Sequence, residues 1–545
     1  MSGAVADRPV SGSTEKSTLI NRTVLSIQHH ECWYLLSALA VFLLAAVYQS
    51  QVKPIWFDEF FTFFISRLSG IPEMLKAMPA DGQPPLQYLL THFSLRCFGE
   101  TAFALRLPEI LAHLGAGLLT WRIVRTHGTA VQALFAMTVL MGATTRSFLS
   151  SLAVGDLAFT ARPYQLVLLF TALAFFSWQF ATMRQYKRLL PLCGITCAIA
   201  GGILSHHFAI IQIGTFLAAG EITRLLRRRK LDWPMLAAIG AGLLPAIFTL
   251  PLGHQTREVL DQAVRHSSTF CAHPAFSDLL SWLLMVPWLL FLPVTVLAIL
   301  PVSAPRTSEH ESSLPAVPTH EVAAAAALSF IFPLQLILAA VLTGYFQARY
   351  AIGGTLGLAI LLAWTWPRAG RLRLMAEPAL AILTIGYLVL SAGNLATAEI
   401  RHPAGRTPPA KTAVPGLLFE APAGLPIVAA NAFEYLPQWW YAPSSLRHRL
   451  IYLTDLEYAV QQPNFMPELS LAIDRAFIPF PQADYAAFLA SHPHFLLLCT
   501  GDPVNDWISA RLRRSGWHLS LLAHSGKDQL FRVDRGTLPP NLSPQ

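Results

Sequence analysis

The chain has little charge for its length. Of its 545 residues, 13% are Asp, Glu, Lys or Arg, whereas 54% are hydrophobic and the mean hydropathy is +0.46. A soluble protein of this size needs more polar residues to cover its surface. The apolar residues also gather in long runs without a single charge, such as 33–48 and 323–342. These features exclude a large soluble protein and indicate a chain that spans a membrane.

Cysteine is scarce as well, and the six cysteines include no CxxC pair. Cys193 and Cys197 lie one helical turn apart in an apolar run, which favours packing over metal binding. A disulfide framework and a zinc module are therefore not expected. The net charge of +8 does not indicate nucleic-acid binding, because the basic residues form short groups between apolar runs. Such groups are typical of the cytoplasmic loops of membrane proteins.

The apolar runs predict an all-α polytopic membrane protein with about eleven transmembrane helices. The expected spans are 33–50, 103–124, 130–150, 164–183, 189–204, 207–223, 234–252, 278–301, 323–343, 350–366 and 376–395. Basic groups follow the second, fourth, sixth and tenth spans, so they share one side, which the positive-inside rule makes cytoplasmic. The N-terminal tail, 1–32, is on the same side, and the odd number of spans places the C-terminal part outside. The first span starts late and is long enough to remain an anchor, so no cleaved signal peptide is expected.

Two adjacent acids, Asp58 and Glu59, follow the first span. They lie in an aromatic stretch that is expected at the outer membrane surface. Partial burial and a neighbouring like charge both raise the pKa of a carboxylic acid, which suits a general base acting near neutral pH. A pair of solvated acids on an interfacial helix is the alternative interpretation, and the residues alone leave it open.

A rigid turn follows in the same outer loop. Asp81 and Gln83 precede two prolines, Pro84 and Pro85, which fix φ and prevent a helix from continuing. The turn either presents Asp81 to a cavity or marks the boundary between a loop and the next helix.

Further polar residues are expected at the outer ends of later spans. An arginine there either grips a phosphate with its planar fork or extends toward lipid headgroups. Two adjacent histidines can be ligands, bases or interface residues. The outer loop 253–277, with three histidines, either folds over a cavity or simply connects two spans. The other outer-end residues are Asp156, Arg162, Tyr164, His206, His207 and Arg349.

Taken in order, these residues resemble the C-type (GT-C) membrane glycosyltransferases. The resemblance covers about residues 33–395 and points to the group of protein O-mannosyltransferases and aminoarabinose transferases, including bacterial members that act on envelope glycans. It implies a multi-spanning catalytic domain that takes a sugar from a polyprenyl-phosphate carrier at the outer face. The residues that carry it are Asp58-Glu59, Asp81, Pro84-Pro85-Leu86, Tyr88, Arg106-Leu107-Pro108 and Ala161-Arg162-Pro163-Tyr164.

The resemblance also implies roles for single residues. Asp58 is expected to be the catalytic base, and Glu59 to position the acceptor or the base. Arg162, Arg349 and Tyr164 are expected to bind the donor phosphate. The residues expected to line the cavity or contact the acceptor are Asp81, Gln83, Pro84, Pro85, Asp156, His206 and His207.

Two departures from the family pattern bear on these roles. Gln83 stands where relatives often have a histidine, which argues against a metal at this turn. Thr160 stands where relatives often have a glutamate, so the role of its loop stays open. No metal ligand or cofactor is assigned, and a requirement for a divalent metal is left open.

The chemistry itself needs few residues. A sugar on a phosphate already carries a stable leaving group, so one base that deprotonates an acceptor hydroxyl is sufficient. Fixed arginines can stabilise the charge that develops on the departing phosphate. We therefore expect a single displacement with inversion at the anomeric carbon. The donor is a polyprenyl-phosphate sugar, and the acceptor is a glycan, a lipid or a protein.

The pattern changes after about residue 395. Residues 396–426 are rich in proline and are expected to form a linker. Short apolar runs alternate with polar turns over 427–545, which predicts a small outer α/β domain with a partly parallel sheet. Its role is open between acceptor recognition and structural support. The expected strands are 427–430, 450–453, 495–498, 517–523 and 529–533.

Two other classes of function compete with sugar transfer. A transporter or lipid flippase would place ionisable residues near the bilayer midplane, whereas the polar residues above lie in outer loops and at helix ends. A membrane scaffold with an outer binding domain is the third class. The expected location is the inner (plasma) membrane of a bacterial cell.

Overall fold

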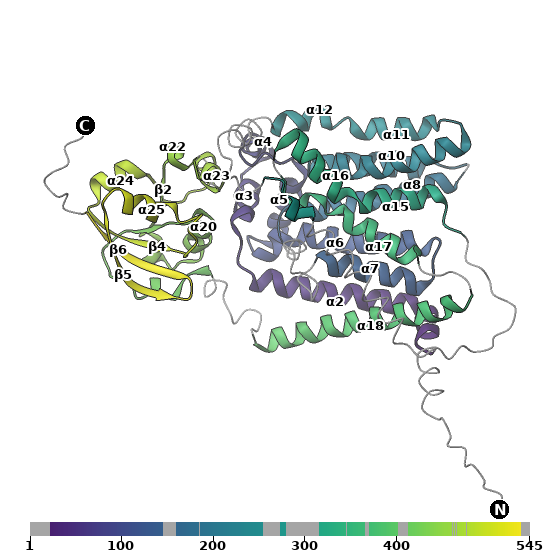
Figure 1. Ribbon diagram of the computed structural model, residues 1–545, viewed down its shortest axis with the longest axis horizontal. Coiled ribbons are helices and arrows are strands. Elements are labelled where there is room, and N and C mark those ends of the chain that lie inside the picture. The colour runs from purple at the N-terminus through teal and green to yellow at the C-terminus, as the bar shows by residue number, and fades with distance from the viewer. Residues whose placement is uncertain are drawn as a thin grey trace, which may run out of the picture.

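The computed structural model describes residues 22–535, apart from 145–159, 185, 254–272, 280–315, 345, 366–369, 402–412, 460, 463, 465 and 476. A bundle of long helices lies beside a smaller unit built around a sheet (Figure 1). Three sequence expectations lie wholly or largely outside the described residues. They are Asp156, the span 278–301 and most of the loop 253–277.

Long apolar helices form the bundle, as the sequence predicts. Five helices are long and apolar enough to cross a membrane, and α15 with α16, bent by 51°, can count as a sixth. Shorter apolar helices stand at 130–142, 189–205, 233–249 and 353–365. The polytopic helical fold is therefore confirmed, and the number of eleven spans stays a prediction. The bundle helices are α2 (Glu31–Val52), α6 (Ala102–Arg125), α7 (Ala130–Thr144), α8 (Tyr164–Met183), α9 (Leu189–Ser205), α10 (Ala209–Arg228), α11 (Trp233–Leu243), α12 (Ala246–Thr249), α15 (Thr319–Ser329), α16 (Ile331–Leu338), α17 (Gly353–Thr365) and α18 (Gly370–Arg401).

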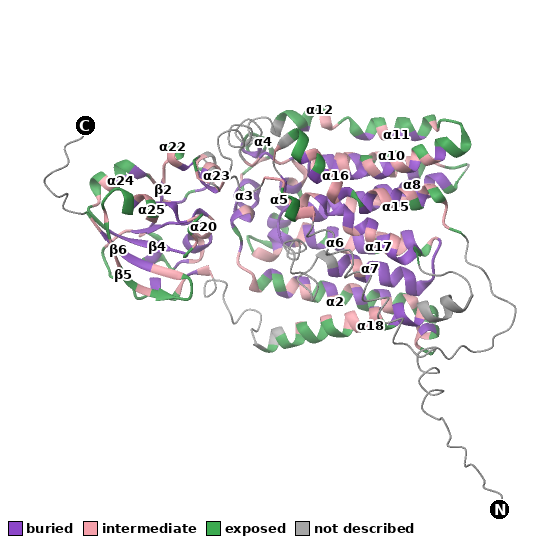
Figure 2. Cartoon of the chain, viewed as in Figure 1, coloured by how far each residue is buried: buried purple, intermediate pink, exposed green. Residues whose placement is uncertain are grey.

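The outer helices of the bundle expose apolar side chains. Figure 2 shows exposed residues along α2, α11 and α18, while α6, α8 and α17 between them are largely buried. Leu44 of α2 is 60% exposed, and Leu390 of α18 is 64% exposed. Leucines exposed in such rows are stable against lipid rather than against water. The burial pattern therefore agrees with a bundle surrounded by a membrane.

Three short helices fill the first long loop of the bundle: α3 (Phe57–Ser66), α4 (Ile71–Asp81) and α5 (Leu86–Phe98). Gly82 ends α4 with φ of 68°, a left-handed conformation that glycine adopts without steric cost. Pro85 then caps α5, so the rigid turn predicted from the two prolines is present. These helices lie at the end of the bundle that faces the smaller unit (Figure 1).

The smaller unit contains a six-stranded sheet of order β3-β2-β1-β4-β6-β5. The first four strands in this order pair in parallel, and β6 runs antiparallel to both β4 and β5. All five predicted strands are present, and β3 is an additional strand of three residues. The strands are β1 (Ile427–Ala429), β2 (Leu450–Thr454), β3 (Gln482–Asp484), β4 (His494–Cys499), β5 (His518–Ser525) and β6 (Asp528–Asp534).

The central strands of this sheet are buried on both faces by helices. Every residue of β1 is buried, which explains why parallel strands such as β1 and β4 read as continuous apolar runs. The edge strand β5 is mostly exposed. The helices around the sheet are α20 (Ala432–Tyr441), α21 (Ser444–Arg447), α22 (Leu456–Ala459), α23 (Met466–Asp474), α24 (Tyr485–Ser491) and α25 (Trp507–Arg514).

Aromatic side chains join the sheet unit to the bundle through α20 and α3. The Phe433 ring lies 5.1 Å from the Phe57 ring, and the Trp440 ring lies 5.3 Å from the Phe63 ring. The Tyr441 hydroxyl accepts a hydrogen bond from the backbone N of Ile55 at 3.0 Å. The sheet unit is thus packed directly against the helix that carries Asp58 and Glu59.

Candidate functional site

Glu59 and Arg106 form a closed ion pair at the start of α3. Both side chains are fully buried. Arg106 Nη2 donates to Glu59 Oε2 at 2.6 Å, and its Nε donates to Oε1 at 2.8 Å. The Glu59 carboxylate also accepts from the backbone N of Trp56 and of Ala161, at 2.9 and 2.8 Å. Every contact of this carboxylate therefore goes to the protein itself.

Arg106 binds further oxygen atoms with its remaining donors. It donates to the carbonyl oxygens of Ser50, Lys53 and Pro54 at 2.7 to 3.1 Å. These residues form the end of α2 and the segment that follows it. One guanidinium on α6 thus holds α2, α3 and, through Glu59, the loop before α8 together.

The pKa of Glu59 is lower than usual. Burial alone would raise it, but the charge of Arg106 and the hydrogen bonds from its guanidinium outweigh that effect. The expectation that both acids of the pair have a raised pKa is therefore wrong for Glu59. Sequence reasoning failed here because the compensating cation is 47 residues away in the chain.

Asp58 directly precedes Glu59 in the chain, but its side chain is only partly enclosed. Its side chain is 15% exposed, and its Oδ2 lies 3.4 Å from Nη1 of Arg349. Arg349 comes from the short helix η4 (Ala348–Ala351), and its side chain is 26% exposed. The Arg349 guanidinium also stands over the Tyr164 ring, 5.5 Å from its centre. Asp58 thus has a long contact, 3.4 Å, with a cation that lies 291 residues later in the chain.

Arg162 links the Asp81 turn to α3. Its Nη1 donates to Asp81 Oδ2 at 2.7 Å and to the carbonyl oxygen of Asp58 at 3.3 Å. The Tyr88 hydroxyl donates to the same Asp81 oxygen at 2.6 Å. The turn therefore places Asp81 against Arg162, and it also marks the boundary before α5, which starts at Leu86.

Both arginines keep an unused donor. The Nε atoms of Arg162 and Arg349 are buried, and neither has a hydrogen-bond acceptor among the residues that the structure describes. A buried donor without an acceptor is costly, so such groups commonly wait for a ligand or a water molecule. Each guanidinium is also charged, because the neighbouring acids Asp81 and Asp58 outweigh burial and raise the pKa of Arg162.

His206 and His207 lie near the same group of residues. The His206 ring is 5.8 Å from the Tyr164 ring and 5.4 Å from the Tyr350 ring. Burial, followed by the charges of His207 and the two arginines, lowers the pKa of His206. Burial also lowers the pKa of His207, against a hydrogen bond with the backbone of Gly82. Both imidazoles are therefore neutral at pH 7 and do not compete with the arginines for an anion.

Most of the residues singled out from the sequence meet at this end of the bundle. Gln83, Pro84 and Pro85 form the turn beside His207, and the Gln83 Oε1 atom is buried without a partner in the described part of the chain. Among the described residues, no three His, Cys, Asp or Glu side chains come close enough to hold a metal ion. The residues that come together are Asp58, Glu59, Asp81, Arg162, Tyr164, His206, His207 and Arg349.

The sequence reasoning did not single out two buried ionisable residues of α6. Glu109 Oε2 accepts from the backbone N of Gln165 and of Leu166, and thereby caps the start of α8. His113 Nδ1 lies 2.8 Å from Gln165 Oε1. Their position inside a predicted span is the signal that could have found them, because ionisable residues there are rare.

Part of the sequence matches a known protein family, and the fold is similar to solved structures. Residues 82–251 match the model of the dolichyl-phosphate-mannose-protein mannosyltransferase family. No curated protein sequence matches the chain. The fold is similar to that of ArnT from Cupriavidus metallidurans in the apo state, at 12% identity and a TM-score of 0.53, over 96% of this chain and 98% of that one.

A second ArnT structure from that organism, bound to undecaprenyl phosphate, is similar to the same degree. Its identity is 12% and its TM-score 0.53, over 94% of this chain and 99% of the other. At this identity the likeness concerns the fold. The predicted resemblance to C-type membrane glycosyltransferases of the aminoarabinose transferase kind is confirmed.

Proposed function

We propose that this protein is a membrane glycosyltransferase that moves a sugar from a polyprenyl-phosphate carrier to an acceptor hydroxyl at the outer membrane face. The observation that carries the proposal is the meeting of Asp58 with two arginines, Arg162 and Arg349, each with a buried and unused Nε donor. The fold similar to ArnT, one structure of which contains undecaprenyl phosphate, supports a polyprenyl-phosphate donor.

Arg349 and Arg162 bind the donor phosphate in this proposal. A phosphate provides acceptors for the unused Nε donors and a negative charge beside two guanidinium groups. The charge on the phosphate increases as the bond to the sugar breaks, so fixed cations stabilise the transition state more than the ground state. Tyr164, under the Arg349 guanidinium, keeps this side chain in place.

Asp58 is the general base. Its side chain is 15% exposed, whereas that of Glu59 has no exposure, and its contact with Arg349 is long. When the donor phosphate engages Arg349, the Asp58 carboxylate is released to accept the proton of the acceptor hydroxyl. The hydroxyl oxygen then forms the new bond to the anomeric carbon as the bond to the phosphate oxygen breaks, with inversion. Binding of the donor and activation of the base are thereby coupled through one arginine.

Glu59 has a positioning role. Its pairing with Arg106 fixes the first turn of α3 against α2 and α6, and this fixes the direction of the neighbouring Asp58. The role is consistent with the sequence expectation that Glu59 positions the base. His206 and His207 provide neutral side chains near the arginines, and Asp81 holds Arg162 in place.

The proposal includes the orientation in the membrane that the basic loops predict. Residues 1–32 are cytoplasmic, 33–395 form the catalytic domain, and 427–545 form the outer domain after a linker at 396–426. The location is the inner membrane. The sheet unit packs on α3, so its proposed role is to hold the catalytic end of the bundle in shape.

The experiment follows the carrier and the sugar separately. Membrane vesicles that contain the protein receive polyprenyl-phosphate sugars labelled in the sugar, and mass spectrometry records free polyprenyl phosphate and glycosylated products. Glycolipids and glycans of cells with and without the protein identify the acceptor. The proposal predicts that carrier release and product formation rise together. Movement of intact donor lipid across the membrane without cleavage would instead identify a flippase.

A further inference from the structure

A second arginine-rich site lies at the opposite end of the bundle. α8 starts at Tyr164 beside the site described above and ends at Met183, so its 20 residues span about 30 Å along its axis. At this far end, a groove of about 600 Å³ lies between the end of α10 and the start of α11. Its charged lining residues are Arg188, Glu221, Arg224, Arg228, Lys230 and Asp232.

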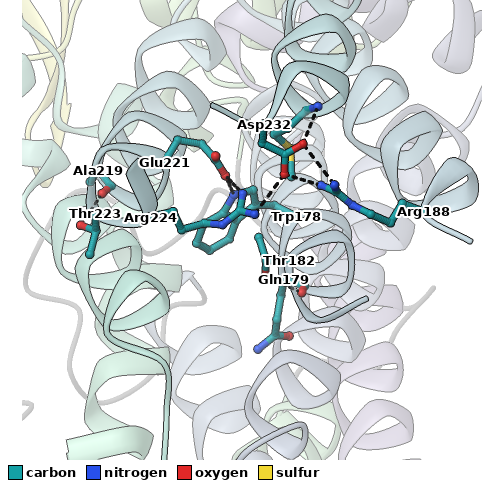
Figure 3. Close-up of polar contacts among 10 residues, drawn as sticks. Trp178, Gln179, Thr182, Arg188, Ala219, Glu221, Thr223, Arg224 and Asp232 are labelled. Carbon is teal, nitrogen blue, oxygen red and sulfur yellow. Dashed lines mark hydrogen bonds and ion pairs between the residues drawn. The ribbon is translucent and has the colours of Figure 1, made fainter. Parts of the chain in front are cut away.

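A rigid ion-pair network forms the floor of this groove (Figure 3). Arg188 binds Asp232 through both ends of its guanidinium, at 2.6 and 3.1 Å. Arg224 lies between two acids, with Nη2 3.0 Å from Asp232 Oδ2 and Nη1 2.5 Å from Glu221 Oε1. The Trp178 indole donates to the same Glu221 oxygen at 2.6 Å. The network joins α8, α10 and the start of α11.

The floor network still has unused donors. Asp232 also accepts from the backbone N of Met235, and its pKa is lowered because the hydrogen bonds from both arginines outweigh burial. The Nε atoms of Arg188 and Arg224 are buried, with no acceptor among the residues that the structure describes. The Arg224 side chain is only 6% exposed. The floor is thus held in place by its own ion pairs, and two of its Nε donors have no acceptor among the described residues.

The mouth of the groove carries the excess positive charge. Arg228 and Lys230 are exposed, and neither forms an ion pair within the described part of the chain. Between them Arg229 has φ of 51° and ends α10 with a left-handed turn that brings Lys230 back to the groove. Because four basic and two acidic residues line the groove, its formal charge is positive by two.

The remaining walls are apolar and exposed. Ile222 is 57% exposed, Leu231 is 50% exposed and Trp233 is 68% exposed. These residues line the groove next to the charged group, and Ile222 and Trp233 belong to helices that are long or apolar enough to lie in a membrane. Tryptophan is favoured at the level of lipid headgroups, where one side of the ring is apolar and the other wet. A soluble anion would use the charged half of the groove alone.

We propose that this groove is a binding site for an anionic phospholipid. The phosphate of the headgroup lies between Arg228, Lys230 and the floor arginines, while the acyl chains follow the apolar wall near Ile222. The headgroup neutralises the excess charge, and its oxygens accept from the unused donors. The bound lipid then stabilises the junction of α8, α10 and α11. This inference does not depend on sugar transfer at the other end.

The test uses the full-length protein in nanodiscs of phosphatidylcholine, to which phosphatidylglycerol is added. Native mass spectrometry counts retained lipid, and thermal unfolding gives the stabilisation and hence an apparent Kd. The double variant R228Q/K230Q is expected to weaken phosphatidylglycerol binding about thirtyfold, since each basic residue contributes to attraction of an anionic lipid. Neither residue is part of the floor network, so melting in pure phosphatidylcholine should match that of the wild type.

The matched control is R227Q/R229Q, which removes the same charge from the same segment. Arg227 and Arg229 are exposed but do not line the groove, so this variant should bind phosphatidylglycerol within about threefold of the wild type. Equal weakening by both double variants would show a diffuse surface charge and overturn the proposal. The same conclusion would follow if inorganic phosphate alone gave the full stabilisation, or if the wild type did not distinguish phosphatidylglycerol from phosphatidylcholine.

Discussion

Two consecutive carboxylates, Asp58 and Glu59, sit in opposite environments. Glu59 is enclosed by Arg106 and backbone N–H groups and has no exposure, whereas Asp58 faces Arg349 across 3.4 Å in a partly open space. A closed pair fixes the geometry, because moving one charge away would leave the other charge buried without a partner, which is costly. In an open pair, a charged group can exchange its partner for a ligand. In the proposed mechanism, the same arginine–carboxylate chemistry serves as an anchor at Glu59 and as a reactive site at Asp58.

Removal of the Asp58 charge should produce the largest change in activity. The variant Asp58→Asn keeps the shape of the side chain but cannot accept a proton, so sugar transfer should fall about 10²- to 10⁴-fold. The melting temperature should stay close to that of the wild type, because Asp58 is not part of the closed anchor. Product formation from a labelled polyprenyl-phosphate sugar and thermal unfolding measure the two quantities. A folded Asp58→Asn protein with full activity would remove Asp58 from the reaction.

Removal of the Glu59 charge should instead lower the stability of the fold. Glu59→Gln leaves the buried Arg106 without its counter-charge and should destabilise the chain by about 3–5 kcal/mol. Glu100→Gln is the matched control, because it removes the same charge from an exposed pair with Arg67 and should cost less than about 1 kcal/mol. Chemical denaturation in detergent compares the two. Equal stability of both variants would show that Arg106 does not need Glu59.

Variants of Arg349 test the role of the cationic partner of Asp58. Arg349→Gln removes a donor to the phosphate and should lower kcat of sugar transfer about 10²- to 10³-fold. Arg349→Lys keeps the charge without the planar fork and should restore part of this loss. Steady-state kinetics with purified donor distinguishes the two variants. Equal activity of Gln and Lys at this position would exclude an electrostatic role for the guanidinium.

Another buried acid, Glu468 on α23, shows how burial changes the pKa of a carboxylic acid that has no arginine as its partner. It accepts from the Trp507 indole at 2.8 Å and from the Tyr452 hydroxyl, and burial raises its pKa to about 7. The pKa of Glu59 moves in the opposite direction because Arg106 is present.

This difference predicts a dependence of stability on pH. Since the pKa of Glu468 in the folded chain lies above the unfolded value of 4.5, its stabilising contribution is complete below about pH 4.5 and is lost as pH rises through 7. Glu468→Gln should therefore match the wild type near pH 4 and be more stable by roughly 3 kcal/mol at pH 8. Urea denaturation of the full chain, followed by proteolysis within residues 427–535, gives the comparison. A pH-independent difference would contradict the assignment.

The smallest expected effect concerns the contact between the sheet unit and α3. Tyr441→Phe removes the hydrogen bond from the Ile55 backbone N and should cost about 1 kcal/mol. Sugar transfer should fall only slightly, because the aromatic packing of Phe433 and Trp440 on α3 remains. Hydrogen exchange of the segment that contains Asp58 should increase in this variant. Unchanged exchange would show that the sheet unit does not stabilise α3.

Much of this architecture follows from local sequence features. The spans follow from apolar run length, the turn at Pro84 and Pro85 from fixed φ angles, and β1 and β4 from short apolar runs. β3 escaped prediction because three residues of mixed polarity carry no periodic signal. The bend between α15 and α16 lies just before Pro333, a local signal for a break that the single predicted span 323–343 did not use.

The division of labour inside the acid pair could not be predicted from spacing alone. Both acids sit in the same aromatic stretch, and only the fold decides which of them meets Arg106 and which meets Arg349. The distances in sequence, 47 residues for the first pair and 291 for the second, leave no local trace. The assignment of Asp58 as the base comes from the family resemblance, which attaches a role to a position in a motif, and it stays a prediction.

The most direct test of the partner exchange is a structure of this protein with a polyprenyl phosphate bound. In this structure the phosphate should contact Arg349 and Arg162, the Asp58 carboxylate should have separated from Arg349, and the Glu59–Arg106 pair should be unchanged. A phosphate bound away from both arginines, with Asp58 still paired to Arg349, would contradict the partner exchange.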